Sequence, residues 1–404
     1  VSMEMFIARQ PIFNQHKRLY AYELLYRGTK TSNLDNTSGN RATTSVLTSA
    51  FLTEGLATIS GLRPCFINFP RDLLLRNLPA SFPKNLLVVE VLEDVPPTAE
   101  ILAVCRKLKD DGYQIALDDF VYHHSLDPLI ALADIIKIDL RLTPLGGLLP
   151  TLRRLADYDL KLLAEKVETY EEFDQAARLG FTLFQGYFFS RPEHIRIQEI
   201  ASTKIVLVQL LAEASAKKTT VRRLQEIIER DVGLTYKLLR YVNSSYFYRL
   251  SKVESVGQAI AYLGEREMRR YLLLVLIAEM CSEKPEELVR LAIVRAKTAE
   301  GLALASSLAA KSDDIFLFCL LSLLDAMLDS SMARICERLS LGDHIKNGLL
   351  HGAGPFAPFL KAIIAHEIHD RQGCLAALEN IGATLDDLQK SYLEGLAFVE
   401  QFPQ

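Results

Sequence analysis

The chain has 404 residues, 49% hydrophobic and 24% charged, a globular composition that is long enough for two domains. Its net charge of −4 lacks the basic excess of a nucleic-acid-binding surface, so we expect no nucleic acid polymer as a partner. The six cysteines form no CxxC pair, which argues against a zinc ribbon and a disulfide scaffold. The first ten residues lack the pattern of a signal peptide and no apolar run is long enough to cross a bilayer, so we expect a cytoplasmic protein without a membrane partner.

Up to about residue 195, short apolar runs alternate with stretches of helical periodicity. Strands are predicted at 6–13, 19–26, 64–69, 85–92, 113–119, 133–139, 160–167 and 181–189, and helices at 40–60, 97–111, 147–157 and 170–179. This alternation is typical of a parallel sheet, and eight runs in this length predict a compact, TIM-like (β/α) barrel domain over residues 1–200. The first two runs are close enough in sequence to pair antiparallel.

Beyond Pro192 the strand pattern ends and helical periodicity continues to the C-terminus. We therefore predict a second, all-helical domain over residues 201–404. Its longest apolar runs, 271–278 and 315–324, are bounded by charged residues and are expected to be core helices.

Polar side chains stand at or near the ends of seven successive predicted strands. They are Glu23, Asn68, Glu90, Asp118 with Asp119, Lys137, Glu165 and Gln185. In a parallel barrel these ends converge on the face where active sites lie. Carboxylates with one asparagine suit hard cations such as Mg²⁺ or Mn²⁺, and a lysine among them can orient or deprotonate an attacking water. The pattern predicts phosphodiester hydrolysis.

Several short motifs occur in a fixed order in this half of the chain. They are QPI at 10–12, ELLYR at 23–27, Asn68 in FINF, EVLE at 90–93, DDF at 118–120, KID at 137–139, EKVE at 165–168 and QGY at 185–187. With this ordered set, residues 6 to about 195 resemble the EAL domain. That resemblance implies a (β/α) barrel that hydrolyses the bacterial second messenger cyclic di-GMP to the linear dinucleotide, using two Mg²⁺ or Mn²⁺ ions.

The resemblance also implies a role for each motif residue. The metal ligands would be Glu23, Asn68, Glu90, Asp118, Asp119 and Glu165, of which Asp119 and Glu165 could act partly through water. The catalytic set would be Lys137, which positions the hydrolytic water, with Glu165 and Glu23. The substrate would be bound by Gln10, Arg27, Asp139, Glu168 and Gln185, with Arg27 on a phosphate. Two alternatives stay open: a salt bridge of Arg27 across the barrel rim, and a buried ion pair of Lys137 with a neighbouring carboxylate.

The chain departs from the family pattern at two places. Leu24 stands where the family has alanine, which adds a larger side chain beside Glu23. The loop 121–125 reads VYHHS instead of a glycine-containing sequence, and valine is poorly suited to positive φ. In the family this loop couples metal binding to dimerisation and Glu93 tethers it. His123 and His124 could be extra metal ligands or a solvated loop. The changed loop keeps a second function open, that of a catalytically degenerate barrel serving as a cyclic di-GMP receptor or protein-interaction scaffold.

The segment 238–274 resembles the HDOD domain, a helical regulatory or scaffolding module. The resemblance implies a protein partner bound through this half and leaves a homodimer possible. A metal-dependent hydrolase of the related HD type needs several histidines and a His-Asp pair, yet no histidine occurs between His194 and His344. His366 and His369 are spaced one helical turn apart, without the HExxH spacing of a metalloprotease, and we expect them on a solvated or interfacial helix face.

Overall fold

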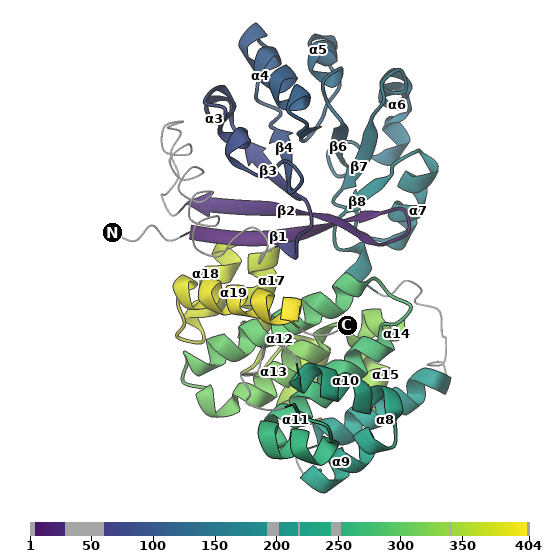
Figure 1. Ribbon diagram of the computed structural model, residues 1–404, viewed down its shortest axis with the longest axis vertical. Helices are drawn as coiled ribbons and strands as arrows, with labels where there is room; N and C mark the ends of the chain where they lie inside the picture. The colour runs from purple at the N-terminus through teal and green to yellow at the C-terminus, as the bar shows by residue number, and fades with distance from the viewer. Residues whose placement is uncertain are drawn as a thin grey trace. The chain divides into compact units, whose positions relative to one another are not determined.

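The computed structural model describes residues 5–28, 60–191, 202–216, 219–243, 252–339 and 341–401 (Figure 1). The chain divides into two compact units, Val1–Phe189 and Ser190–Gln404. We call them the barrel unit and the helical unit and describe each by itself. The helix predicted at 40–60 lies outside the described residues.

Eight strands of the barrel unit close into a barrel in chain order (Figure 1). They are β1 (Met5–Asn14), β2 (Leu19–Gly28), β3 (Cys65–Phe69), β4 (Leu87–Val91), β5 (Gln114–Leu117), β6 (Ile135–Asp139), β7 (Lys161–Glu165) and β8 (Leu183–Gln185). Strand β1 is antiparallel to both β2 and β8, and every other neighbouring pair is parallel. The predicted barrel and the antiparallel start are confirmed.

Helices follow the strands around the barrel. They are α3 (Arg71–Leu75), α4 (Ala99–Asp110), α5 (Asp127–Ile130), α6 (Leu149–Leu155) and α7 (Tyr170–Arg178). Local sequence explains where two of them begin: the hydroxyl of Thr98 accepts from the backbone N–H of Ile101 and that of Thr169 from Glu172, each satisfying an otherwise unpaired helical donor. The helices predicted at 97–111, 147–157 and 170–179 correspond to α4, α6 and α7.

The strands stack two layers of side chains inside the barrel. One layer is apolar and buried, with one residue from each strand: Ile12, Ala21, Phe66, Val88, Ala116, Ile135, Leu163 and Leu183. Because side chains alternate along a strand, residues two positions away point to the same side. Two positions further toward the C-terminal ends of β2 to β8 stand Glu23, Asn68, Glu90, Asp118, Lys137, Glu165 and Gln185. Strand β1 runs the other way, so its corresponding residue is Gln10, two positions before Ile12. A polar layer therefore lies on the apolar layer, at the C-terminal mouth of the parallel strands.

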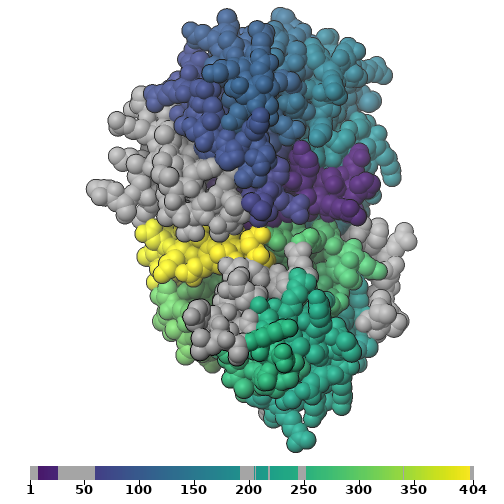
Figure 2. Space-filling model, in the orientation of Figure 1, coloured from purple at the N-terminus to yellow at the C-terminus, as the bar shows by residue number. Residues whose placement is uncertain are grey.

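The helical unit is all-α in its described part, as predicted. Its helices are α8 (Ser202–Ser215), α9 (Val221–Glu229), α10 (Val232–Val242), α11 (Val256–Met280), α12 (Glu286–Leu304), α13 (Ser312–Leu320), α14 (Leu324–Leu328), α15 (Met332–Arg338), α16 (Asp343–His351), α17 (Ala357–Glu367), α18 (Arg371–Glu379) and α19 (Leu385–Gln401). Helix α11 breaks at Gly264, whose φ of 77° is unsuited to an L side chain. Figure 2 draws the barrel unit in purple to teal and the helical unit in teal to yellow.

Helix α12 is the central element of the helical unit and packs against α13, α17 and α19. A buried ion pair joins α12 to α17: the Nε and NH2 groups of Arg295 donate to the two carboxylate oxygens of Glu367, at 2.8 and 2.6 Å. In the described part of the chain, no single helix is long and apolar enough to span a bilayer. One bent pair, Ala309–Leu328 with Met332–Arg338, meets that criterion by length and composition only.

The structure contradicts the solvated helix face predicted as one possibility for the two C-terminal histidines. His366 is buried and its ring lies edge-on to Tyr392, with centroids 4.7 Å apart. Helix α17 ends at Glu367, and His369 follows with a left-handed backbone, φ 60°. The two histidines do not share a solvated helix face, because apolar packing covers the first and the helix ends before the second.

Candidate active site

Lys137 lies at the centre of the polar layer and is fully buried. Its Nζ is 2.5 Å from Glu90 Oε1, 2.6 Å from Asp118 Oδ1, 3.0 Å from Glu165 Oε1 and 3.6 Å from Glu23 Oε1. These four carboxylates stand on or directly after four other strands, so barrel closure alone brings them together. The predicted convergence of strand ends at this mouth is thus seen in the geometry. The same geometry contains the buried ion pair that was the alternative reading of Lys137.

The cluster holds more acidic groups than basic ones. Four carboxyl groups face one ammonium, and Glu90 is completely buried. Burial disfavours the charged form of a carboxyl group. It raises the pKa of Glu90 well above its usual value and the pKa of Glu165 to about 8, although Lys137 opposes the shift of both groups. Burial alone would lower the pKa of Lys137, but the surrounding carboxylates outweigh it and raise that pKa. The site therefore has a deficit of positive charge.

Neutral side chains complete the layer on one side. The amide nitrogen of Asn68 donates to Glu23 Oε1 at 3.4 Å. The amide nitrogen of Gln185 donates to Glu23 Oε2 at 2.6 Å and to Gln10 Oε1 at 2.9 Å. The predicted ligands Glu23 and Asn68 and the predicted substrate residues Gln10 and Gln185 therefore form one connected network across β1, β2, β3 and β8.

Two predicted aspartates lie at the rim. Asp119 follows Asp118 with a left-handed backbone, φ 40°. Burial, followed by the charge of Asp118, raises the pKa of Asp119. Asp139, two positions beyond Lys137 on β6, accepts bonds from the backbone N–H groups of Arg141 at 2.7 Å and Leu142 at 3.3 Å. Neither aspartate is among the four carboxylates that contact Lys137.

A lysine that the sequence reading did not single out also reaches this rim. The Nζ of Lys166, directly after Glu165, lies 2.5 Å from Asp139 Oδ2. Its only sequence signal was its place inside the EKVE motif. The contact itself joins residues 27 positions apart, one at the end of β6 and one directly after β7, and could not be read from that motif.

The remaining predicted residues lie farther from the cluster. Glu168 is half-buried in the loop after β7, where its backbone N–H donates to Glu172 Oε2 at 2.8 Å. Arg27 pairs with Phe6 in the β1–β2 ladder, and its side chain lies outside the described residues. Glu93 is exposed in the turn after β4, and within the described residues no hydrogen bond or ion pair joins it to 121–125. The geometry gives the expected tether no support.

Comparison with known protein families identifies one domain in each half of the chain. The EAL domain model matches residues 63–192 and the HDOD domain model matches residues 200–340. A Vibrio cholerae protein named cyclic di-GMP phosphodiesterase CdgJ is 35% identical over 392 residues, which covers 96% of this chain and 91% of that protein. The chain belongs to the EAL–HDOD family.

A second relative matches over a similar extent of the chain. The Bacillus subtilis protein YuxH, described as uncharacterized, is 34% identical over 404 residues, covering 98% of each chain. Among solved structures, a standalone EAL protein from Vibrio cholerae in its c-di-GMP-bound form is 25% identical and covers 47% of this chain and 92% of that one, with a TM-score of 0.38. A Klebsiella pneumoniae BlrP1 complex with manganese and cyclic di-GMP is 26% identical, covers 46% and 55%, and has a TM-score of 0.37.

The residues of the EAL barrel fit a divalent cation by their chemistry. Both carboxylate oxygens of Glu90 are buried: Oε1 lies 2.5 Å from Lys137 Nζ, and Oε2 has no hydrogen-bond partner within the described residues. Carboxylate and amide oxygens are the donors that hard cations prefer. The described residues contain no group of three or more His, Cys, Asp or Glu side chains already arranged around one ion. The carboxylates point instead at Lys137, so ion binding requires them to turn away from the ammonium.

The departures from the EAL pattern affect the rim more than the cluster. Leu24 is buried, and strand alternation turns it away from Glu23, to the outer side of the barrel wall. In the changed loop, Val121 is exposed and has no positive φ. The exposed ring of His123 caps the short 3₁₀ helix η3 (His124–Leu126), accepting from the N–H of Ser125. This placement favours a solvated loop for the two histidines over a metal-ligand role.

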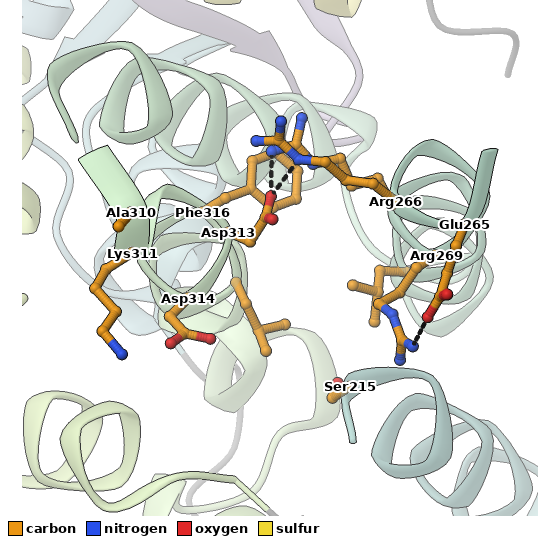
Figure 3. A pocket seen from close by; sticks show the side chains of 12 residues that line it. Ser215, Glu265, Arg266, Arg269, Ala310, Lys311, Asp313, Asp314 and Phe316 are labelled. Atoms are coloured by element: carbon orange, nitrogen blue, oxygen red, sulfur yellow. Dashed lines mark hydrogen bonds and ion pairs between the residues drawn. The ribbon is translucent and has the colours of Figure 1, made fainter. Parts of the chain in front are cut away.

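The HDOD unit contains a cavity of about 530 Å³ between α11, α13 and the end of α8 (Figure 3). Arg266, Arg269, Arg270 and Lys311 line it together with acidic side chains. Arg269 donates to the carbonyl oxygens of Ala214, Ala216 and Thr219, so its guanidinium closes the C-terminal end of α8.

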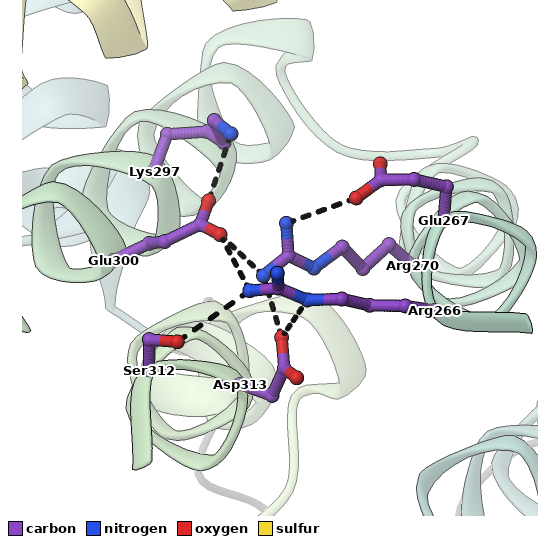
Figure 4. Close-up of polar contacts among 7 residues, drawn as sticks. All are labelled: Arg266, Glu267, Arg270, Lys297, Glu300, Ser312 and Asp313. Atoms are coloured by element: carbon purple, nitrogen blue, oxygen red, sulfur yellow. Dashed lines mark hydrogen bonds and ion pairs between the residues drawn. The ribbon is translucent and has the colours of Figure 1, made fainter. Parts of the chain in front are cut away.

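The other two arginines of this cavity are bound to shared carboxylates (Figure 4). Asp313 Oδ1 accepts from Arg266 at 2.8 Å and from Arg270 at 2.6 Å. Glu300 accepts from both arginines and, at 2.8 Å, from Lys297. This network joins α11, α12 and α13. Because its positive groups are neutralised within the protein, we assign it a structural role and no chemistry.

Proposed function

We propose that the EAL barrel hydrolyses cyclic di-GMP to the linear dinucleotide with two divalent cations, Mg²⁺ or Mn²⁺. The observation that carries the proposal is the cluster of four carboxyl groups around one buried lysine at the C-terminal mouth of the barrel. Two divalent cations would offset its excess negative charge. Membership of the EAL–HDOD family and the similarity to CdgJ support the same substrate.

The cations would be held by the oxygen ligands of the polar layer and the adjacent rim. These are Glu23, Asn68, Glu90, Asp118, Asp119 and Glu165. When bound, the cations supply a Lewis acid that polarises the phosphodiester and lowers the pKa of water.

The chain's own residues then orient the reaction. Lys137 keeps its charge among carboxylates, so its ammonium donates hydrogen bonds and holds the attacking water in line with the phosphorus. Water adds to phosphorus as one ester P–O bond breaks, and the leaving oxygen takes a proton to give the linear product. Glu165 and Glu23 belong to this catalytic set.

Substrate binding is assigned to Gln10, Arg27, Asp139, Glu168 and Gln185. An amide pair such as Gln10 and Gln185 provides neutral donors and acceptors for a guanine edge, whereas Arg27 provides a planar fork for a phosphate. Replacing Arg27 by alanine should weaken cyclic di-GMP binding, which isothermal titration calorimetry would measure.

For the whole chain we propose a bacterial cytoplasmic protein with a barrel domain over 1–200 and an HDOD domain over 201–404. The HDOD domain would act by binding a protein partner or a second copy of this chain. In its charged cavity Arg266 and Arg270 are paired with Asp313 and Glu300, and its Arg295–Glu367 pair is buried, which supports action by surface contact and not by catalysis.

The test is incubation of the purified chain with cyclic di-GMP and Mg²⁺ or Mn²⁺, with products separated by chromatography. We expect the linear dinucleotide from the wild type and none from Glu23→Ala, while Glu100→Ala, an exposed residue of α4, behaves as the wild type. Absence of turnover by a well-folded wild type contradicts hydrolysis. Binding without turnover would favour the receptor function, which the changed loop 121–125 and the exposed Glu93 keep open.

A further inference from the structure

Lys166 has a backbone conformation that disfavours its side chain. Its φ is 54°, in the left-handed region, and it directly follows Glu165 at the end of β7. A residue other than glycine pays roughly 1 kcal/mol or more in this region. Such strain persists where the surrounding structure imposes it, and it is frequent at functional sites.

Neighbouring backbone fixes this turn. The N–H of Val167 donates to the carbonyl oxygen of Gln185 at 2.9 Å, and the carbonyl oxygen of Val167 accepts from Phe188 at 3.2 Å. Gly186 lies so close that a Cβ there would clash with the backbone of Val167. The conformation of Lys166 is therefore set by the packing of the β7 and β8 ends, and any residue at this position would be held in it.

The side chain of Lys166 lies at the mouth of the barrel beside the candidate site. Its Nζ is 2.5 Å from Asp139 Oδ2, yet 60% of the Lys166 side chain is exposed, against 2% for Asp139. Asp139 also accepts two backbone N–H bonds. Those two backbone bonds still hold the Asp139 carboxylate when the exposed ammonium of Lys166 turns from it toward an anionic ligand.

Among the carboxylates around it, the ammonium of Lys166 is a positive group for an anionic ligand at this part of the mouth. Asp118, Asp119, Asp139 and Glu165 all stand at or near the mouth, and carboxylates repel a ligand that carries two phosphodiester charges. We propose that Lys166 is a substrate-binding residue, whose ammonium pairs with a non-bridging phosphate oxygen of the cyclic dinucleotide as it enters the barrel. This inference rests on the proposed function and adds a residue to its binding site.

Lys166→Gly separates this role from a structural one, because glycine removes the charge and also relieves the backbone strain. We expect the Kd for cyclic di-GMP, measured by calorimetry with Ca²⁺ present, to rise roughly three- to tenfold. The dependence of Kd on salt should become weaker. KM should rise by more than kcat falls. The melting temperature should not decrease, and Lys166→Arg should restore most of the affinity.

The matched control is Lys107→Ala, which removes an exposed lysine of α4 and should change neither Kd nor its salt dependence. If wild type binds and Lys166→Gly binds equally well with the same salt dependence, Lys166 is only a structural partner of Asp139 and the inference is overturned. Binding by wild type without turnover refutes hydrolysis but still tests Lys166 through Kd. Absence of binding by folded wild type overturns both proposals.

Discussion

Replacing Glu367 by glutamine should strongly destabilise the HDOD unit. Glu367 accepts both hydrogen bonds from Arg295, and the side chains of the pair are 4% and 6% exposed. The substitution leaves the guanidinium in the core between α12 and α17 without its carboxylate. Removing one partner of such a buried pair costs about 3–5 kcal/mol, and at about 2–4 °C per kcal/mol for a unit of this size the melting temperature should fall by roughly 6–20 °C.

The assay is thermal and urea unfolding of the full chain, followed by circular dichroism at a wavelength dominated by helix. The control is Glu100→Gln, which breaks an ion pair of 3.2 Å to Arg71 whose side chains are 70% and 42% exposed, and should cost less than about 1 kcal/mol. A double variant, Arg295→Met with Glu367→Leu, should recover most of the loss, since it leaves no unpaired charge. If Glu367→Gln destabilises no more than the exposed control, the reasoning is refuted.

Three further results are expected. Mn²⁺ should raise the melting temperature by mass action, about 2.7 kcal/mol of stabilisation at one hundred times its Kd, and Asp118→Asn should lose this effect; equal melting in Mn²⁺ and in chelator would contradict the cation site. Lys137→Ala should abolish turnover while calorimetry still detects cyclic di-GMP binding, and the reverse pattern would mean that its role is misassigned. Burial opposes ionisation of Glu300, but Lys297 and Arg270 outweigh this effect and lower the pKa of Glu300 in the folded chain below its ordinary value of 4.5. The ionised Glu300 therefore stabilises the fold above about pH 4.5, and this stabilisation is lost as the pH falls through the lowered pKa of the folded state. Glu300→Gln should accordingly flatten the decline of the urea midpoint as pH falls from about 5 to about 3, and an unchanged decline would argue against this coupling.

The sequence by itself determined the elements of the barrel and the composition of its mouth. Each strand is a short apolar run whose side chains alternate, and this period of two fixes which residues face inward once one of them is known. Glu23, Glu90, Lys137 and Glu165 each stand two positions after an apolar inward residue. Their shared side and shared end of the strands were therefore predictable before any distance was known.

Only the tertiary structure decided which of these groups touch. Closure of the barrel brings Glu23 and Lys137, 114 positions apart, to 3.6 Å, and no local pattern encodes the ring in which their strands lie. The left-handed backbone of Lys166 likewise comes from packing between the ends of β7 and β8. In the HDOD unit, helical periodicity predicted the helices and allowed a solvated or an interfacial face for His366, and only the structure shows that His366 is buried beside Tyr392. Local periodicity fixes the direction of a side chain within its own element; the partner that it meets depends on contacts between segments distant in sequence, and these form only when the whole chain folds.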